Sequence, residues 1–286
     1  MSLAHYINTG TRKSNEDYVR VDPSNKIFVI GDGMSKHVRG DMASLLGVET
    51  AFAYLHLNSV QVLGRVAEQI PFNLIPYFFL WNAGHFANRA VFDFNVANKI
   101  DSGSTLEAIR IIGNRLHLCH IGDSRVYRTR NGKLEQVTKD HYADTIIDGC
   151  LYSGITCSLG EVITRGDVLS CTLEKDEIVL ICTDGLPNDV EDSTLENYVL
   201  KGKTPEEIKR IIAENHGGKT SDNCTFIIYK HDGLDINDGT HSPDWDRLRN
   251  ALAKEKPRPI TEPVIKENVI PKNKSLVERI KEMIRI

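Results

Sequence analysis

Residues 26–40 read KIFVIGDGMSKHVRG. Ile27–Ile30 form an apolar run without a polar break, and Gly31, Asp32 and Gly33 follow directly. A short apolar run bounded by glycines predicts a buried strand that ends in a tight turn. Such a turn would hold one carboxylate, that of Asp32, at the end of a rigid strand. An isolated Asp-Gly pair, however, is more often an ordinary turn than a functional site.

Three later stretches repeat this arrangement of an aspartate beside an apolar run. They are Ile121-Gly122-Asp123, Cys182-Thr183-Asp184-Gly185 and Ser221-Asp222-Asn223. The repetition favours a shared site over four unrelated turns.

The rest of the chain alternates between helical blocks and antiparallel strands. Apolar spacings of three and four predict helices near 42–55 and 75–98, a third helix is expected from about 192 to 202, and Thr204-Pro205-Glu206-Glu207 is a capping box that starts another. Gly113-Asn114 and Asn131-Gly132 are hairpin signals. Strands are expected near 18–21, 106–112, 116–121, 125–129, 133–137, 168–173, 177–182 and 224–229. This order predicts an α+β fold rather than a parallel βαβ repeat.

Composition restricts the class of protein. A hydrophobic content of 41% is enough for a sizeable core, and a net charge of −4 gives no reason to expect a nucleic acid partner. The six cysteines form no CxxC pair, which predicts a reducing compartment without disulfides or zinc. No signal peptide and no membrane span are expected, so we predict a cytoplasmic location.

The chain changes character after about Asp232. Five prolines punctuate a charged stretch, so we expect a domain at residues 1–232 and an extension at 233–286. Leu276, Ile280 and Ile284 form one stripe in Ser275–Ile286, which predicts a terminal amphipathic helix. Docking on its own domain, binding to a partner protein and binding to a membrane surface are all open for this helix.

The aspartates carry the chemistry suggested by the sequence. Carboxylates gathered in one cleft repel one another unless cations neutralise them. Oxygen ligands without His or Cys suit hard ions such as Mg²⁺ or Mn²⁺. Arg12 lies four residues before Glu16, and its guanidinium matches two oxygens of a phosphate. An arginine beside a metal pair indicates hydrolysis of a phosphate ester. From these residues alone, solvated turn carboxylates remain the alternative.

Eight motifs follow one another in a fixed order over about residues 5–230. They are Gly10-Thr11-Arg12 with Asn15-Glu16-Asp17, Val29–Met34 with His37, Ser102–Thr105, Ile121–Tyr127, Thr138–His141, Thr156–Gly160, Cys182–Leu186 and Ser221–Thr225. The ordered set resembles the metal-dependent protein phosphatases, the type 2C Ser/Thr phosphatases, in their bacterial form.

That resemblance implies a four-layer αββα sandwich of two antiparallel sheets flanked by helices, with a metal cleft at one edge. It implies that Asp32 bridges two Mn²⁺ or Mg²⁺ ions, with the Gly33 carbonyl on one of them. Asp184 and Asp222 would hold the other ion. Asp123 matches a residue that binds a third, weaker ion together with the Asp184 position.

The resemblance also implies roles for three residues near the N-terminus. Arg12 is expected to clamp the substrate phosphate, and Glu16 and Asp17 are expected to hold metal-bound water. The catalytic set would then be Arg12, Asp32 and Asp184. A hydroxide that bridges the two ions would attack phosphorus in line, and no phospho-enzyme would form.

The expected activity is therefore that of a protein phosphatase acting on phosphoserine and phosphothreonine, with phosphorylated proteins as substrates and a Ser/Thr kinase as counterpart. Family members usually have two glycines where this chain has Ser35 and Lys36. This departure leaves an inactive pseudo-phosphatase, which binds phosphoproteins or serves as a scaffold, as the alternative. A two-metal nuclease is disfavoured by the acidic charge balance.

Overall fold

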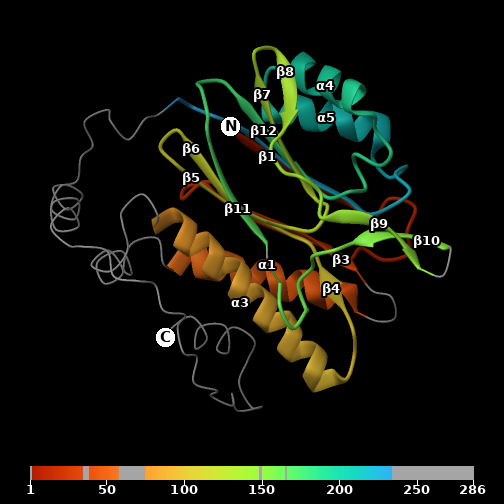
Figure 1. Cartoon of the computed structure of the whole chain (residues 1–286). Coiled ribbons are helices and arrows are strands. Elements are labelled where there is room, and N and C mark those ends of the chain that lie inside the picture. Colours follow the sequence, from red (N-terminus) through yellow and green to blue (C-terminus); the bar gives the residue numbers. More distant parts are fainter. Residues whose placement is uncertain (1, 35–38, 58–74, 148–149, 165, 234–286) are drawn as a thin grey trace, which may run out of the picture.

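Two antiparallel sheets lie between two pairs of helices in the computed structural model of the chain (Figure 1). The structure describes residues 2–34, 39–57, 75–147, 150–164 and 166–233. The predicted elements of the extension, together with Ser35 and Lys36, lie outside these residues. The expected α+β sandwich of two antiparallel sheets flanked by helices is confirmed.

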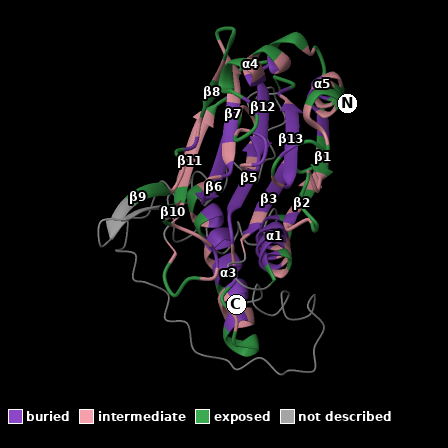
Figure 2. Cartoon of the chain, turned by 90° about the vertical axis from the view of Figure 1, so that its right-hand side faces the viewer, coloured by how far each residue is buried: buried purple, intermediate pink, exposed green. Residues whose placement is uncertain are grey.

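One sheet has five strands in the order β1-β13-β12-β7-β8. The other has the order β11-β6-β5-β3-β2, with the short β4 paired to β3. A separate hairpin, β9–β10, projects from the sandwich in Figures 1 and 2. The strands are β1 Leu3–Asn8, β2 Asp17–Asp22, β3 Ile27–Met34, β4 Gly103–Ser104, β5 Leu106–Ile112, β6 Arg115–Ile121, β7 Arg125–Arg130, β8 Lys133–Gln136, β9 Tyr142–Ile147, β10 Cys150–Ile155, β11 Asp167–Thr172, β12 Ile178–Cys182 and β13 Cys224–Lys230.

The period of two along each strand divides the core into three layers. In β12, Val179 and Ile181 face the other sheet, whereas Leu180 packs toward helices. In β3, Phe28 and Ile30 fill the space between the sheets, whereas Ile27 and Val29 pack under the other pair of helices. Figure 2 shows the resulting bands of buried residues along the central strands. Both sheets are therefore covered on both faces.

Two helices cover each outer face. Helices α1 (Gly40–Leu57) and α3 (Ile75–Asn98) pack on the β3–β5–β6 side, and α4 (Asp192–Lys201) and α5 (Pro205–His216) pack on the β12–β13 side. The predicted cap of α5 is confirmed, because the Glu207 amide donates to Thr204 Oγ1 at 3.2 Å. Among the described residues, none of the helices combines the length and apolar character needed to cross a bilayer.

The end predicted for the strand that begins at Ile27 is wrong. β3 does not turn at Gly31-Asp32-Gly33 but continues to Met34. It continues because Asp32 pairs with Asp17 on β2, and Gly33 pairs with Ser104 on β4. Partners distant in sequence thus override a local turn signal. Strand β1, the two-residue β4 and the β9–β10 hairpin were not predicted.

Candidate active site

The topology brings four aspartates from distant parts of the chain to one edge of the sandwich. Asp17 and Asp32 face each other directly in the β2–β3 register. In the other sheet, β12 and β13 are antiparallel, with Cys182 opposite Phe226. The residue that follows β12 by two positions, Asp184, therefore lies at the same end as Asp222, which precedes β13.

Thr183 joins the two sheets beneath these carboxylates. Its hydroxyl donates to Asp17 Oδ2 at 2.9 Å and accepts from the Thr225 amide at 3.0 Å. The Thr183 amide donates in turn to the Thr225 carbonyl at 3.0 Å. Thr183 has no exposed surface. It was not singled out from the sequence, because only the fold shows that it lies next to Asp17.

Gly33 lies where no side chain fits. A Cβ atom there would lie 2.2 Å from the Gly40 carbonyl oxygen and 2.6 Å from that of Glu16. The Gly33 amide donates to the same Glu16 oxygen at 3.0 Å. A Cβ atom on Gly40 would in turn lie 2.4 Å from Glu16 Oε2. The Asp32-Gly33 segment is therefore packed directly against the start of α1 and the Glu16 loop.

Burial and mutual repulsion disfavour the charged forms of the aspartates. Burial raises the pKa of Asp17 to about 7, against the hydrogen bond from the Thr183 hydroxyl, which lowers it. Burial raises the pKa of Asp32 well above its usual value, and the charges of Asp17 and Asp184 add to the effect. The pKa of Asp184 is also raised, mainly by burial. Anions held this closely call for a cationic partner.

Two carboxylate oxygens at this edge, Asp17 Oδ1 and Asp184 Oδ1, are buried and have no hydrogen-bond partner among the described residues. A buried carboxylate oxygen without a donor is costly, and a hard cation would satisfy it. The donor set of aspartate oxygens thus fits Mg²⁺ or Mn²⁺. Within the described part of the chain, no three His, Cys, Asp or Glu side chains already stand in the arrangement that would hold an ion.

Arg12 lies at the same edge of the sandwich as the aspartates and pairs with Asp222. Its Nη2 is 2.6 Å from Asp222 Oδ2, and its Nε donates to the Ser221 carbonyl at 3.2 Å. The Arg12 side chain is 58% exposed, so one face of the guanidinium is open to an incoming anion. The structure therefore places the predicted phosphate clamp beside a predicted metal ligand.

Asn223 fixes the loop that carries Arg12 and Glu16. Its Oδ1 accepts from the Glu16 amide at 2.7 Å, and its Nδ2 donates at 2.9 Å to the carbonyls of Thr9 and Ser14. The sequence signal for Asn223 was its place directly after Asp222. The N-terminal loop and the start of β13 are consequently held as one unit.

Asp123 approaches the same cluster from the turn after β6. Burial and the charge of Asp184 raise the pKa of Asp123 to about 6. Thr105 links this turn to β3, because its hydroxyl accepts from the Asp32 amide at 2.9 Å and lies 2.8 Å from Ser124 Oγ. The side-chain amide of Asn188 donates from Nδ2 to Asp184 Oδ2 at 3.0 Å. All eight predicted site residues therefore lie on the segments that meet at this edge.

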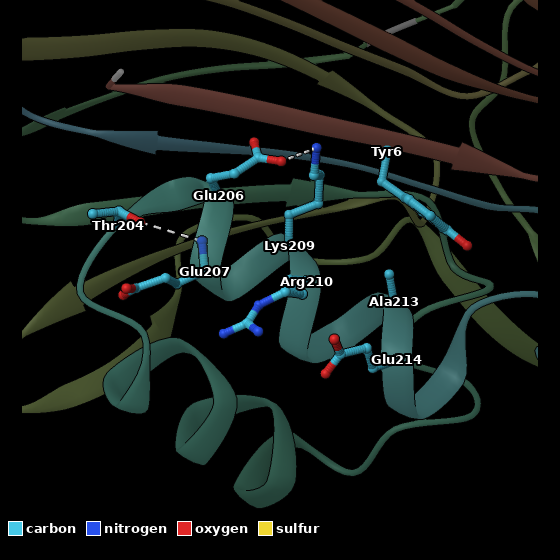
Figure 3. A pocket seen from close by; sticks show the side chains of 8 residues that line it. All are labelled: Tyr6, Thr204, Glu206, Glu207, Lys209, Arg210, Ala213 and Glu214. Carbon is cyan, nitrogen blue, oxygen red and sulfur yellow. Dashed lines mark hydrogen bonds and ion pairs between the residues drawn. The ribbon is translucent and has the colours of Figure 1, made fainter.

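A hollow of about 750 Å³ lies elsewhere, along β1 and α5 (Figure 3). Glu206 and Lys209 form an ion pair there, and acidic and basic side chains of α5 both line the hollow. It is lined by Tyr6, Thr204, Glu206, Glu207, Lys209, Arg210, Ala213 and Glu214. None of the predicted site residues lines this hollow, so it is separate from the aspartate cluster.

Comparisons with known proteins agree with the motifs. The family model described as protein phosphatase 2C matches residues 7–206. The Ser/Thr protein phosphatase PstP of Mycobacterium tuberculosis is 31% identical over 229 residues, which cover 76% of this chain and 42% of that protein. The chain thus matches less than half the length of PstP. The protein phosphatase PhpP of Streptococcus pneumoniae is 26% identical, over 76% of this chain and 92% of its own length.

Solved structures show the same likeness. A crystal structure of M. tuberculosis PstP superposes with a TM-score of 0.64 at 26% identity, over 80% of this chain and 98% of that one. The PstP catalytic domain in complex with two manganese ions gives a TM-score of 0.63 at 27% identity, over 80% and 96% of the two chains.

Proposed function

Since this chain belongs to the protein phosphatase 2C family, we propose that it is a metal-dependent phosphatase that hydrolyses phosphoserine and phosphothreonine in proteins. The observation that carries the proposal is the cluster of Asp17, Asp32 and Asp184, whose carboxyl groups are raised in pKa and include two buried oxygens without a donor. Such a cluster gains most from binding hard cations.

The aspartates would hold Mn²⁺ or Mg²⁺ in this proposal. Asp32, the Gly33 carbonyl, Asp184 and Asp222 are the proposed ligands for two ions, and Asp123 is the proposed ligand for a third. When bound, such ions act as Lewis acids and make water a better nucleophile at neutral pH. The structure of PstP with two manganese ions supports the choice of metal.

Side chains around the ligands orient the substrate and the ligands themselves. Arg12 presents its exposed guanidinium for two phosphate oxygens, and the Ser221 carbonyl accepts from its Nε and holds the group in place. Glu16 and Asp17 would keep water at the ions. Thr183 fixes the orientation of the Asp17 carboxylate by donating to it. The protein thereby supplies a rigid group of carboxylates for the ions and, beside it, one arginine for the phosphate.

The wider biology is part of the same proposal. Phosphorylated proteins would be the substrates, as the names of the bacterial relatives suggest. A Ser/Thr kinase would supply them. A cytoplasmic location follows from the expected reducing environment of the six cysteines. Residues 233–286 would form an extension outside the phosphatase domain and bind a partner protein.

Phosphate release from a phosphothreonine peptide tests the activity. We expect release that requires Mn²⁺, stops with chelator and falls at least about 100-fold in Asp32→Asn, because a metal ligand is lost. Turnover that persists in chelator would contradict the mechanism. Binding of Mn²⁺ and phosphopeptide without turnover would instead establish the pseudo-phosphatase.

A further inference from the structure

We propose that Asp140 and His141 are positioning residues for the Asp123 carboxylate. They hold both sides of the turn that carries Asp123 and join it to the base of the β9–β10 hairpin. This inference rests on the proposed function, in which Asp123 contributes to cation binding. It concerns two residues of the motif Thr138–His141 for which no role could be predicted from the sequence.

His141 holds the N-terminal side of the turn through Gly122. The His141 amide donates to the Gly122 carbonyl at 2.8 Å, and the Gly122 amide donates back to His141 Nδ1 at 3.1 Å. Because an amide can only donate, Nδ1 must be unprotonated and the ring proton must sit on Nε2. That nitrogen lies 3.3 Å from Asp167 Oδ2 on β11, which accepts its hydrogen bond. The ring is thus fixed at both nitrogens.

Asp140 holds the C-terminal side of the turn through Arg125. The guanidinium donates to the Asp140 carboxylate from Nε, at 3.0 and 3.1 Å, and from Nη2, at 2.8 Å. Each of the two side chains is only 24% exposed. A bidentate pair of this kind fixes orientation as well as distance. Residues on both sides of Asp123 are therefore tied to one dipeptide.

The dipeptide itself rests on a buried pair in the second sheet. His120 Nε2 donates to the Lys139 carbonyl at 2.9 Å, and its Nδ1 is hydrogen-bonded to Glu107 directly across the β5–β6 register. Both of these side chains are fully buried. The rings of His120 and His141 lie 4.5 Å apart. The position of His141 is thereby set from the core rather than from the surface.

The same histidine closes the base of the hairpin. β9 begins at the next residue, Tyr142, and the Thr156 amide, directly after β10, donates to the His141 carbonyl at 2.8 Å. Both arms of the hairpin are therefore joined to the Gly122 turn through one residue. A change at His141 would shift the turn and loosen the hairpin together.

The turn that carries Asp123 is tightly packed, so its backbone has little room to move. Gly122 has φ +106°, and a Cβ atom there would lie 2.5 Å from Thr105 Cγ2. The backbone before Asp123 thus has no room to adjust when its hydrogen bonds are removed. Residues that orient a metal ligand without binding the metal themselves typically change metal affinity 10–100-fold when they are removed.

Calorimetric titration of the full chain with Mn²⁺ tests the proposal. The reference is the binding step that is lost in Asp123→Asn. We expect His141→Ala to weaken that step about tenfold, and His141→Asn to restore it because an amide oxygen can accept from Gly122. His117→Ala, which removes a buried histidine from the far part of β6, is the matched control and should leave the step unchanged.

Several results would overturn the proposal. They are wild-type Mn²⁺ binding in His141→Ala, equal weakening in His117→Ala, or no binding step that depends on Asp123. If His141→Ala does not fold, Asp140→Asn serves instead, because it keeps the side-chain shape but loses the charge that holds Arg125. Wild-type protein that binds Mn²⁺ but hydrolyses no phosphate ester would contradict the proposed function alone. The Mn²⁺ affinities of the variants could still be measured and compared with that of the wild type.

Discussion

Removing the Thr183 hydroxyl is a sharp test of how the two sheets are held together at the site. Thr183→Val keeps the shape of the side chain but removes the donor to Asp17 Oδ2 and the acceptor for the Thr225 amide. Each buried group left without a partner costs about 1–3 kcal/mol. Two such groups give an expected loss of about 3 kcal/mol in the free energy of unfolding.

Thr183→Ser is the matched control, because it keeps the hydroxyl and loses only a buried methyl group, at a cost of about 1 kcal/mol. Urea unfolding followed by circular dichroism gives both free energies. We expect the valine variant to be less stable than the serine variant by about 2 kcal/mol. A valine variant as stable as the serine variant would refute the role of this hydroxyl.

Three further outcomes follow from the geometry. Gly33→Ala should lower the thermal unfolding midpoint by more than 10 °C or prevent folding, because its Cβ would lie 2.2 Å from the Gly40 carbonyl; an unchanged midpoint would contradict the packing. Asp32→Asn should stabilise the metal-free protein by about 1 kcal/mol, since it removes repulsion among buried carboxylates; destabilisation in urea would argue against that repulsion. Burial lowers the pKa of His120, but Glu107 outweighs this effect and raises it to about 9. Burial raises the pKa of Glu107 to about 7. Because both pKa values are raised, the protein should lose stability as the pH rises from about 4.5 to about 9, so Glu107→Gln should flatten the pH dependence of unfolding in that range, whereas an unaltered slope would exclude the pair as its source.

Elements defined by neighbouring residues could be predicted from the sequence. The hairpin at Gly113-Asn114 joins β5 and β6 as expected, and Thr204 caps α5 as expected. In both cases the signal and the structure lie within a few residues of each other. Local turn and cap chemistry therefore decided these parts of the fold.

Elements that depend on distant partners could not be predicted. β1 is an edge strand of mixed apolar and polar residues, and among the described residues it pairs with β13 alone, more than 200 residues later in the chain. β11 and β12 follow each other closely, yet β11 pairs with β6 while β12 pairs with β7 and β13. No pattern within a strand says which sheet it will join.

The same distinction between local and distant contacts separates the site residues that could be predicted from those that could not. The aspartates were predictable because each stands in a recognisable motif, either inside a strand, as Asp32 does, or within two residues of a strand end. Thr183 and Asn223 were missed because their contacts, to Asp17 and to the Glu16 loop, join segments more than 160 residues apart. The charged groups of the site could thus be predicted from the sequence, whereas the residues that hold them in place needed the fold.

The most direct test of the central claim is a crystal structure of the full chain with Mn²⁺, in which anomalous scattering locates the ions. We predict at least two Mn²⁺ peaks next to the carboxylates of Asp32, Asp184 and Asp222, with Arg12 turned away from Asp222 to leave its oxygens free for an ion. An intact pair between Arg12 and Asp222 without a peak at these carboxylates, in crystals grown at saturating Mn²⁺, would contradict a metal-dependent phosphatase built on this edge of the sandwich.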